Sequence, residues 1–202
     1  MLDRVATAAL RPLLEAGAGV LVRRGVGADA VTLAGFALGM AAAVAIAFGA
    51  FGWGLALLLA SRLADGLDGA VARLTQPSDR GAFLDITFDF LFYASIPLAF
   101  AIAEPAANAL PAAVLLAAFS GTASSFQAFA VFAERRGLAR TAQPQKGFFY
   151  LGGLTEATET LICFALMCLW PQQFAWWAYG FAGLCALTIV TRLVGGARAL
   201  TR

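Results

Sequence analysis

The sequence contains no histidine and has few charged residues. Of its 202 residues, 61% are hydrophobic and only 13% are charged, whereas a soluble domain carries about 25% charged residues. Together with a mean hydropathy of +0.80, this composition indicates a membrane protein. The absence of histidine excludes Ser-His-Asp and Cys-His mechanisms and any histidine-ligated zinc site. A general base in this chain must therefore be a carboxylate, Lys, Tyr or Cys.

Cysteine and net charge are equally scarce. Cys163, Cys168 and Cys185 lie in apolar segments without Cys-x-x-Cys spacing, and we interpret them as buried thiols without a metal or redox role. The net charge of +2 is too small to indicate binding to nucleic acid. Membrane lipid is the partner that this composition favours instead.

Long apolar segments fill most of the chain and predict its fold. A helix that crosses a bilayer needs about 20 largely apolar residues, and six segments meet this requirement. Residues 1–25 are interrupted by polar residues and predict an amphipathic helix at the membrane surface. We therefore expect one all-α integral membrane domain over residues 1–202, with this interfacial helix followed by a six-helix bundle over 26–202. The predicted spans are residues 30–49, 51–73, 82–103, 109–133, 147–170 and 173–193.

The basic residues predict the topology of this bundle. All 14 Lys and Arg residues lie near the chain ends or around the connections between spans two and three and between spans four and five. Because basic connections face the cytoplasm, both termini and these two connections are predicted to be cytoplasmic. Five or seven spans would break this alternation, so the charge pattern supports the count of six.

Four aspartates cluster at the predicted cytoplasmic ends of spans two and three. Asp65 and Asp68 stand at positions i and i+3 of one helix, and Asp85 and Asp89 stand at i and i+4 of the next. Each pair therefore lies on one helix face. The short connection at 74–80 predicts that the two helices are antiparallel neighbours, so that all four carboxylates converge. Four like charges at that depth repel one another unless a cation offsets them.

Divalent metal is the cation that this donor set favours. Oxygen-only ligands point to Mg²⁺, Mn²⁺ or Ca²⁺, and two ions that bridge a pyrophosphate would balance the four carboxylates. Gly69 and Gly81 leave room for a bulky substrate near the helix backbone, and Arg73 can hold a phosphate. The alternative, that the aspartates cap helices or pair with arginine, is the interpretation that we prefer only for Asp79.

The segment from Asp65 to Asp89 resembles the signature of the CDP-alcohol phosphatidyltransferase family. That signature reads Asp, two residues, Asp-Gly, two residues, Ala-Arg, seven or eight residues, Gly, three residues, Asp, three residues, Asp, and every fixed position is met with the seven-residue spacer. Residues 30–35 are similar to the start of the family's first span, with Ala28 where many members have proline. Other segments are similar to a bacterial inner-membrane branch of the family, namely residues 85–93 and 150–156.

This resemblance implies a reaction and a set of functional residues. It implies transfer of a phosphatidyl group from a CDP-linked lipid, CDP-diacylglycerol, to the hydroxyl of a small polar alcohol, with release of CMP. It also implies a homodimer in the bacterial inner membrane that uses Mg²⁺ or Mn²⁺, with two ions bound. Asp65, Asp68 and Asp85 are implied metal ligands, and Asp89 is implied as both ligand and general base. The residues implied at the CDP site are Gly69, Ala72, Arg73, Gly81 and Thr32.

The acceptor alcohol is the part of the reaction that the residues leave open. Arg140 and Lys146, between spans four and five, could attract a phosphorylated acceptor, but we favour the positive-inside rule as their explanation. Glu156 and Glu159 lie in the predicted fifth span, where a functional role would favour a cationic or polyhydroxyl acceptor. Hydrogen bonding to neighbouring threonines is the alternative role for both. Polar residues of the fourth span could line the same cavity or join helices, namely Ser120, Thr122, Ser124, Ser125 and Gln127.

Two other classes of membrane protein also use intramembrane carboxylates. A membrane prenyltransferase binds Mg²⁺ and a pyrophosphate substrate, but its acidic motifs lie far apart, whereas these four acids lie within 25 residues. A divalent-cation transporter would be favoured by inverted repeats, and we detect none. Release of CMP from a CDP-linked lipid distinguishes the transferase from both alternatives.

Overall fold

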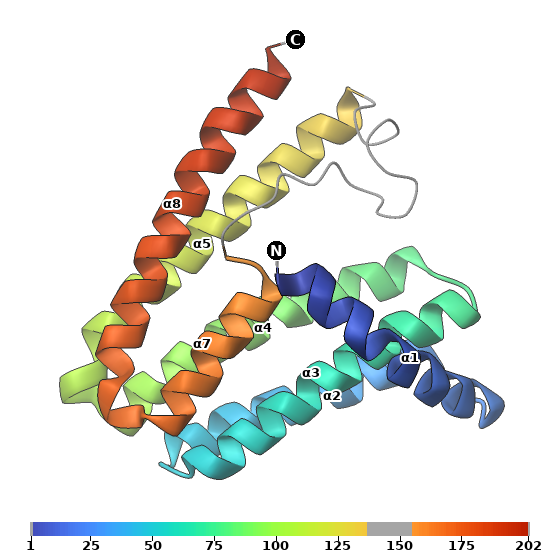
Figure 1. Ribbon diagram of the computed structural model, residues 1–202, viewed down its shortest axis with the longest axis horizontal. Coiled ribbons are helices and arrows are strands. Elements are labelled where there is room, and N and C mark those ends of the chain that lie inside the picture. Colours follow the sequence, from blue (N-terminus) through green and yellow to red (C-terminus); the bar gives the residue numbers. More distant parts are fainter. Residues whose placement is uncertain (1, 137–154, 202) are drawn as a thin grey trace.

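The computed structural model describes residues 2–136 and 155–201, and this part of the chain is helical, without β-strands (Figure 1). The all-α class predicted from the long apolar segments is therefore confirmed. A short 3₁₀ turn, η1 (Pro171–Gln173), precedes the last helix. The helices are α1 (Leu2–Arg23), α2 (Ala28–Ala47), α3 (Phe51–Leu74), α4 (Asp79–Ala103), α5 (Pro105–Arg135), α7 (Ala157–Leu169) and α8 (Phe174–Leu200).

Four helical segments in the described residues are long and apolar enough to cross a membrane. They are α2, α4, α5 and the segment Pro171–Leu200 that combines η1 with α8, and they coincide with predicted spans one, three, four and six. The helix α3 coincides with the second predicted span, but charged residues interrupt its second half. The helix α7 has 13 residues, and 147–154 lie outside the described residues. The count of six spans and the interfacial position of α1 therefore stay predictions.

The start of α7 corrects the predicted location of Glu156 and Glu159. We predicted both inside a span that begins at 147, but Glu156 is the N-cap of α7 and Glu159 lies in its first turn. Each side chain accepts a hydrogen bond from the other residue's backbone N–H, and the distance from the Glu156 nitrogen to Glu159 Oε2 is 3.2 Å. This capping box satisfies N–H groups that a helix start leaves without partners. The physical reason for the error is that hydropathy alone does not register such a cap.

Glycines let α2 pack closely against α3 and α4. A Cβ atom on Gly39 would lie 2.6 Å from a ring carbon of Phe92 and 3.0 Å from Ser61 Oγ. A Cβ atom on Gly35 would lie 3.1 Å from the Cβ of Ala64. Gly35 and Gly39 form a GxxxG pair on the close-packing face of α2, because side chains at either position would push the helices apart.

The alanine substitution at Gly39 is expected to destabilise the protein by about 1–3 kcal/mol, the usual cost of overpacking a core. Phe92 is fully buried and cannot move aside easily. The same substitution at Gly183, whose added Cβ would meet nothing within 4 Å, should be neutral or stabilising because alanine favours helix more than glycine does. Thermal unfolding in detergent micelles measures both variants. Equal increases in melting temperature would contradict the packing argument.

The helix α3, which carries two of the aspartates, is held from two sides. The helix α2 packs against both α3 and α4, and α1 lies across the second half of α3 (Figure 1). The helices α1 and α3 also approach each other closely at glycines. A Cβ on Gly66 would lie 3.0 Å from Leu14, and one on Gly17 would lie 2.9 Å from Leu67. The helices α5 and α8 run side by side, away from this contact (Figure 1). The aspartate-bearing half of α3 therefore has a fixed position relative to α4.

Candidate active site

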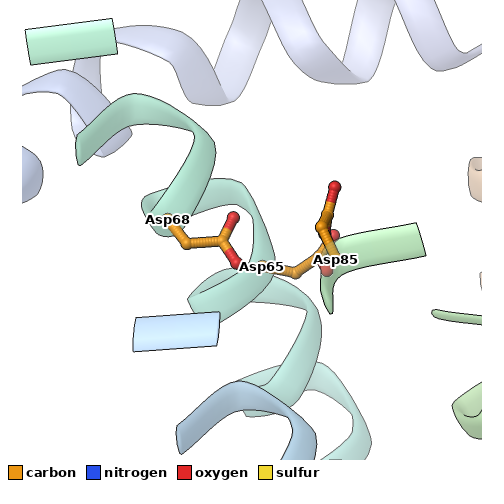
Figure 2. A group of neighbouring side chains, drawn as sticks. All are labelled: Asp65, Asp68 and Asp85. Carbon is orange, nitrogen blue, oxygen red and sulfur yellow. The ribbon is translucent and has the colours of Figure 1, made fainter. Parts of the chain in front are cut away.

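Three of the four predicted aspartates form one group between α3 and α4. Asp65, Asp68 and Asp85 each offer a carboxylate oxygen, and these oxygens lie within 4.8 Å of one another. Figure 2 shows Asp65 and Asp68 on α3 and Asp85 on α4. The helical spacing of Asp65 and Asp68 places both on one face, as predicted, and the next helix supplies the third carboxylate. Oxygen donors in this number and arrangement fit a hard divalent ion.

Asp68 is the member of this group whose surroundings most favour a bound cation. Its side chain belongs to a residue that is only 6% exposed, and its Oδ2 atom is buried without a hydrogen-bond partner in the described structure. A buried carboxylate oxygen without a partner is costly. Thr32 on α2 lies beside the same carboxyl group, and its hydroxyl also donates to the Ala28 carbonyl oxygen at 3.1 Å. Mg²⁺ or Mn²⁺ would supply the partner that Oδ2 lacks.

The fourth aspartate, Asp89, is not part of this group but is bound by an arginine. Arg62 Nη1 donates a hydrogen bond to Asp89 Oδ1 at 2.6 Å and lies 3.6 Å from Asp65 Oδ1. The guanidinium stacks on the Phe92 ring, 3.9 Å from its centroid. Asp89 of α4 is therefore linked to α3 by its ion pair with Arg62. Its role as a metal ligand stays a prediction.

Most residues predicted at the CDP site lie at the same end of α3 and α4. Arg73 follows Gly69 by one turn, and its Nη1 lies 3.4 Å from the place of a Gly69 Cβ. The Gly81 N–H donates to Ser78 Oγ at 3.0 Å, so Ser78 caps α4. Asp79 lies in the first turn of α4, beside that cap. An acidic group there interacts favourably with the helix dipole, in line with the capping role that we prefer for Asp79. Ala72 is partly buried and precedes Arg73.

A cavity of about 730 Å³ lies beside Asp89, between α4, α5, α8 and the start of α7. Arg192 of α8 is on its wall, donates to the Thr122 carbonyl oxygen at 3.1 Å, and lies 5.6 Å from the Phe126 ring. The cavity therefore combines an apolar wall with a few polar groups. Its polar lining consists of Asp89, Tyr93, Thr122, Gln127, Thr155, Glu156, Thr160 and Arg192.

The residues predicted for the acceptor are divided by the structure. Glu156 lines the cavity, while Glu159 serves in the capping box of α7. Arg140 and Lys146 lie outside the described residues. Two of the polar residues of the fourth predicted span, Thr122 and Gln127, also line the cavity.

Sequence reasoning missed the two arginines that contribute to the site. Arg62 and Arg192 served only as topology markers, although Arg62 stands at i−3 from Asp65 and so shares its helix face. That spacing could have identified Arg62. No local pattern marks Arg192, because its neighbours in the cavity come from distant parts of the chain.

Comparison with known proteins places the chain among known relatives. The family model of CDP-alcohol phosphatidyltransferases matches residues 26–193. The inner membrane protein YnjF of Escherichia coli (strain K12) is 47% identical over 199 residues, which cover 97% of this chain and 95% of that protein. The archaetidylinositol phosphate synthase of Methanothermobacter thermautotrophicus is 49% identical over 65 residues, which cover 32% of this chain and 33% of that protein.

A solved structure shares the fold. The crystal structure of the Mycobacterium tuberculosis phosphatidylinositol phosphate synthase (PgsA1), with CDP-DAG bound, matches with a TM-score of 0.66 and 23% sequence identity. The match covers 92% of this chain and 94% of that chain. The family match includes the whole aspartate signature, which confirms the resemblance noted from the sequence. The chain belongs to the CDP-alcohol phosphatidyltransferase family and is an enzyme of that class.

Proposed function

We propose that this enzyme transfers the phosphatidyl group of CDP-diacylglycerol to the hydroxyl of a small polar alcohol and releases CMP. The observation that carries the proposal is the group of three carboxylates with the buried, unpartnered oxygen of Asp68. The family match supports the reaction class, and the CDP-DAG bound by a structural relative supports the donor.

The proposed donor site joins the metal group to the residues at the ends of α3 and α4. Asp65, Asp68 and Asp85 would hold Mg²⁺ or Mn²⁺, with a second ion present when the CDP-lipid is bound. Such ions would supply positive charge to offset the pyrophosphate and the oxygen that leaves with CMP. Arg73 is exposed over Gly69 and offers a phosphate a planar set of N–H donors. The remaining residues proposed at the nucleotide are Gly69, Ala72, Gly81 and Thr32.

Asp89 is the proposed general base. Its carboxylate is on the cavity wall, while its backbone lies one turn from Asp85 of the metal group. The acceptor hydroxyl gives its proton to Asp89 as its oxygen forms a bond to the phosphorus of the phosphatidyl group. The bond from that phosphorus to the bridging oxygen breaks, and CMP leaves with this oxygen and the electron pair. Arg62 keeps Asp89 oriented, so proximity contributes to the rate as well.

The proposed acceptor site is the cavity beside Asp89. Its polar groups include threonine hydroxyls, the acidic residue Glu156 and the basic residue Arg192. Hydroxyl groups both donate and accept hydrogen bonds, and so they suit this mixed lining. A polyhydroxyl alcohol therefore fits the cavity better than a purely anionic acceptor.

Replacing Glu156 by glutamine is expected to change the acceptor preference by about 10–100-fold, because a hydrogen bond to a charged group contributes about 1.5–3 kcal/mol. The amide oxygen can still cap α7, so the fold should survive. Glu159→Gln is the matched control, since it makes the same change in the same capping box. CMP release is measured with glycerol 3-phosphate, inositol phosphate, serine, choline, ethanolamine and phosphatidylglycerol. Identical preferences for the variant and the wild type would remove Glu156 from the acceptor site.

The direct test of the function is CMP release by the purified protein in detergent micelles. CMP should form from CDP-diacylglycerol only when an acceptor and Mg²⁺ or Mn²⁺ are both present, and a chelator should stop it. Absence of CMP with every acceptor, or CMP release that a chelator does not change, would contradict the proposal.

We also propose six spans with both termini and the active site on the cytoplasmic side of a bacterial inner membrane, and a homodimer.

A further inference from the structure

Arg62 is a cation placed inside the acidic site, and the reaction proposed above gives it no chemical step. Its side chain is only 13% exposed, and one nitrogen, Nη1, lies 2.6 Å from Asp89 Oδ1 and 3.6 Å from Asp65 Oδ1. By contrast, the ion pair of Arg11 with Glu15 is exposed at the protein surface. Arg62 thus bridges a carboxylate of the metal group and the carboxylate that lies beside it.

Two further contacts fix the guanidinium in this place, and the second is itself anchored to α2. Its Cζ atom lies over the Phe92 ring, 3.9 Å from the ring centroid. Its Nη2 donates to Ser61 Oγ at 3.3 Å, and Ser61 in turn donates to the Gly35 carbonyl oxygen of α2 at 2.8 Å. Ser61 is fully buried. Arg62 is therefore anchored to α2 through Ser61 and to α4 through Phe92, and its charge cannot leave the site without breaking buried contacts.

We propose that Arg62 is a positioning residue that holds the place of a second cation between Asp65 and Asp89 until the CDP-lipid binds. In this state one divalent ion binds to Asp65, Asp68 and Asp85, and Asp89 is held on the cavity wall and does not ligate metal. This inference rests on the metal group of the proposed function, and it adds the residue that separates the fourth aspartate from the other three.

The geometry carries this inference because Arg62 and a second ion would need the same oxygens. Paired catalytic ions lie about 3.5–4 Å apart, so a second ion would need oxygens next to those of the first. An ion bridging Asp65 and Asp89 would bind Oδ1 atoms that now face Arg62 Nη1. A guanidinium and a divalent ion in that space would also repel each other strongly at low dielectric. The second ion can therefore enter only when Arg62 moves away from these two carboxylates. The negative charge of the donor's pyrophosphate would favour the movement of Arg62 and the binding of the second ion.

The experiment measures Mn²⁺ binding to the full chain in detergent micelles without CDP-lipid, using the electron paramagnetic resonance signal of free Mn²⁺. The wild type should bind one ion per chain. Arg62→Met, which keeps an apolar contact with Phe92 but removes the charge, should bind a second ion. The double variant Arg62→Met/Asp89→Asn should return to one ion, because the second ion needs the Asp89 carboxylate. Arg11→Met, which removes an exposed ion pair at 2.7 Å that involves none of the four aspartates, is the matched control and should bind one ion.

Two results would overturn the proposal. The first is two tightly bound ions in the wild type, and the second is a single ion in a folded Arg62→Met variant. If Arg62→Met does not fold, Asp89→Asn alone decides, because its Mn²⁺ affinity should equal that of the wild type if Asp89 is not a ligand. A tenfold loss of affinity in Asp89→Asn contradicts the proposal. Failure of the proposed function is a separate result, since CMP release can be absent from a protein that still binds one Mn²⁺.

Discussion

Asp89→Asn is expected to lower the rate of CMP release by about 10²–10⁴-fold, the contribution usual for a general base, while CDP-lipid binding stays largely intact. The amide has the size of the carboxylate but cannot accept the proton of the acceptor hydroxyl. Asp89 lies outside the group formed by Asp65, Asp68 and Asp85, so the three carboxylates that would hold the first ion are unchanged. Steady-state CMP release at saturating substrates measures the rate, and fluorescence titration with a labelled CDP-lipid measures the binding.

The matched control for this prediction is Asp79→Asn. Asp79 is an exposed aspartate at the start of the same helix, α4, and is not part of the three-carboxylate group. Its replacement should leave turnover within about twofold of the wild type, as is usual for surface substitutions. Asp89 is not the base if Asp89→Asn retains more than about a tenth of wild-type turnover. Loss of CDP-lipid binding together with turnover would instead indicate that Asp89 belongs to the donor site.

The sequence was sufficient for the long apolar helices because hydropathy is a local property. The predicted spans at 82–103 and 109–133 are found as α4 (Asp79–Ala103) and α5 (Pro105–Arg135), with small shifts at their ends. The start of α7 could not be found in this way, because Glu156 begins it with side-chain hydrogen bonds to the backbone. Hydropathy carries no information about such bonds.

The same distinction holds for the site. Residues on one helix face follow from spacing, and so Asp65, Asp68 and Asp85 were predicted together and lie together. The partner of Asp89 depends on how α3 and α4 are oriented when both pack on α2. Spacing along the sequence does not predict that orientation. The spacing predicted that all four carboxylates converge, whereas the structure separates them into three that face one another and one bound by Arg62.

The substitution with the second large effect is Asp68→Asn, which is expected to abolish metal-dependent turnover. Asp68 is the buried member of the group, and its Oδ2 atom has no other partner in the described structure. A neutral amide there removes one of three negative charges and points N–H donors at the metal site. Bound metal contributes several kcal/mol to transition-state stabilisation, so we expect a loss of about 10³-fold or more in CMP release. Mn²⁺ titration should show a parallel loss of affinity.

Stability separates this loss of function from simple unfolding, because the two should change in opposite directions. Without metal, Asp68→Asn should stabilise the fold by about 1–3 kcal/mol, since it removes a buried charge that repels Asp65 and Asp85. Metal at 100 times its dissociation constant should stabilise the wild type by about 2.7 kcal/mol but leave the variant unchanged. A variant that melts lower than the metal-free wild type would contradict this account. A higher melting temperature with no response to Mn²⁺ would show that the charge of Asp68 is kept for metal binding at the expense of stability.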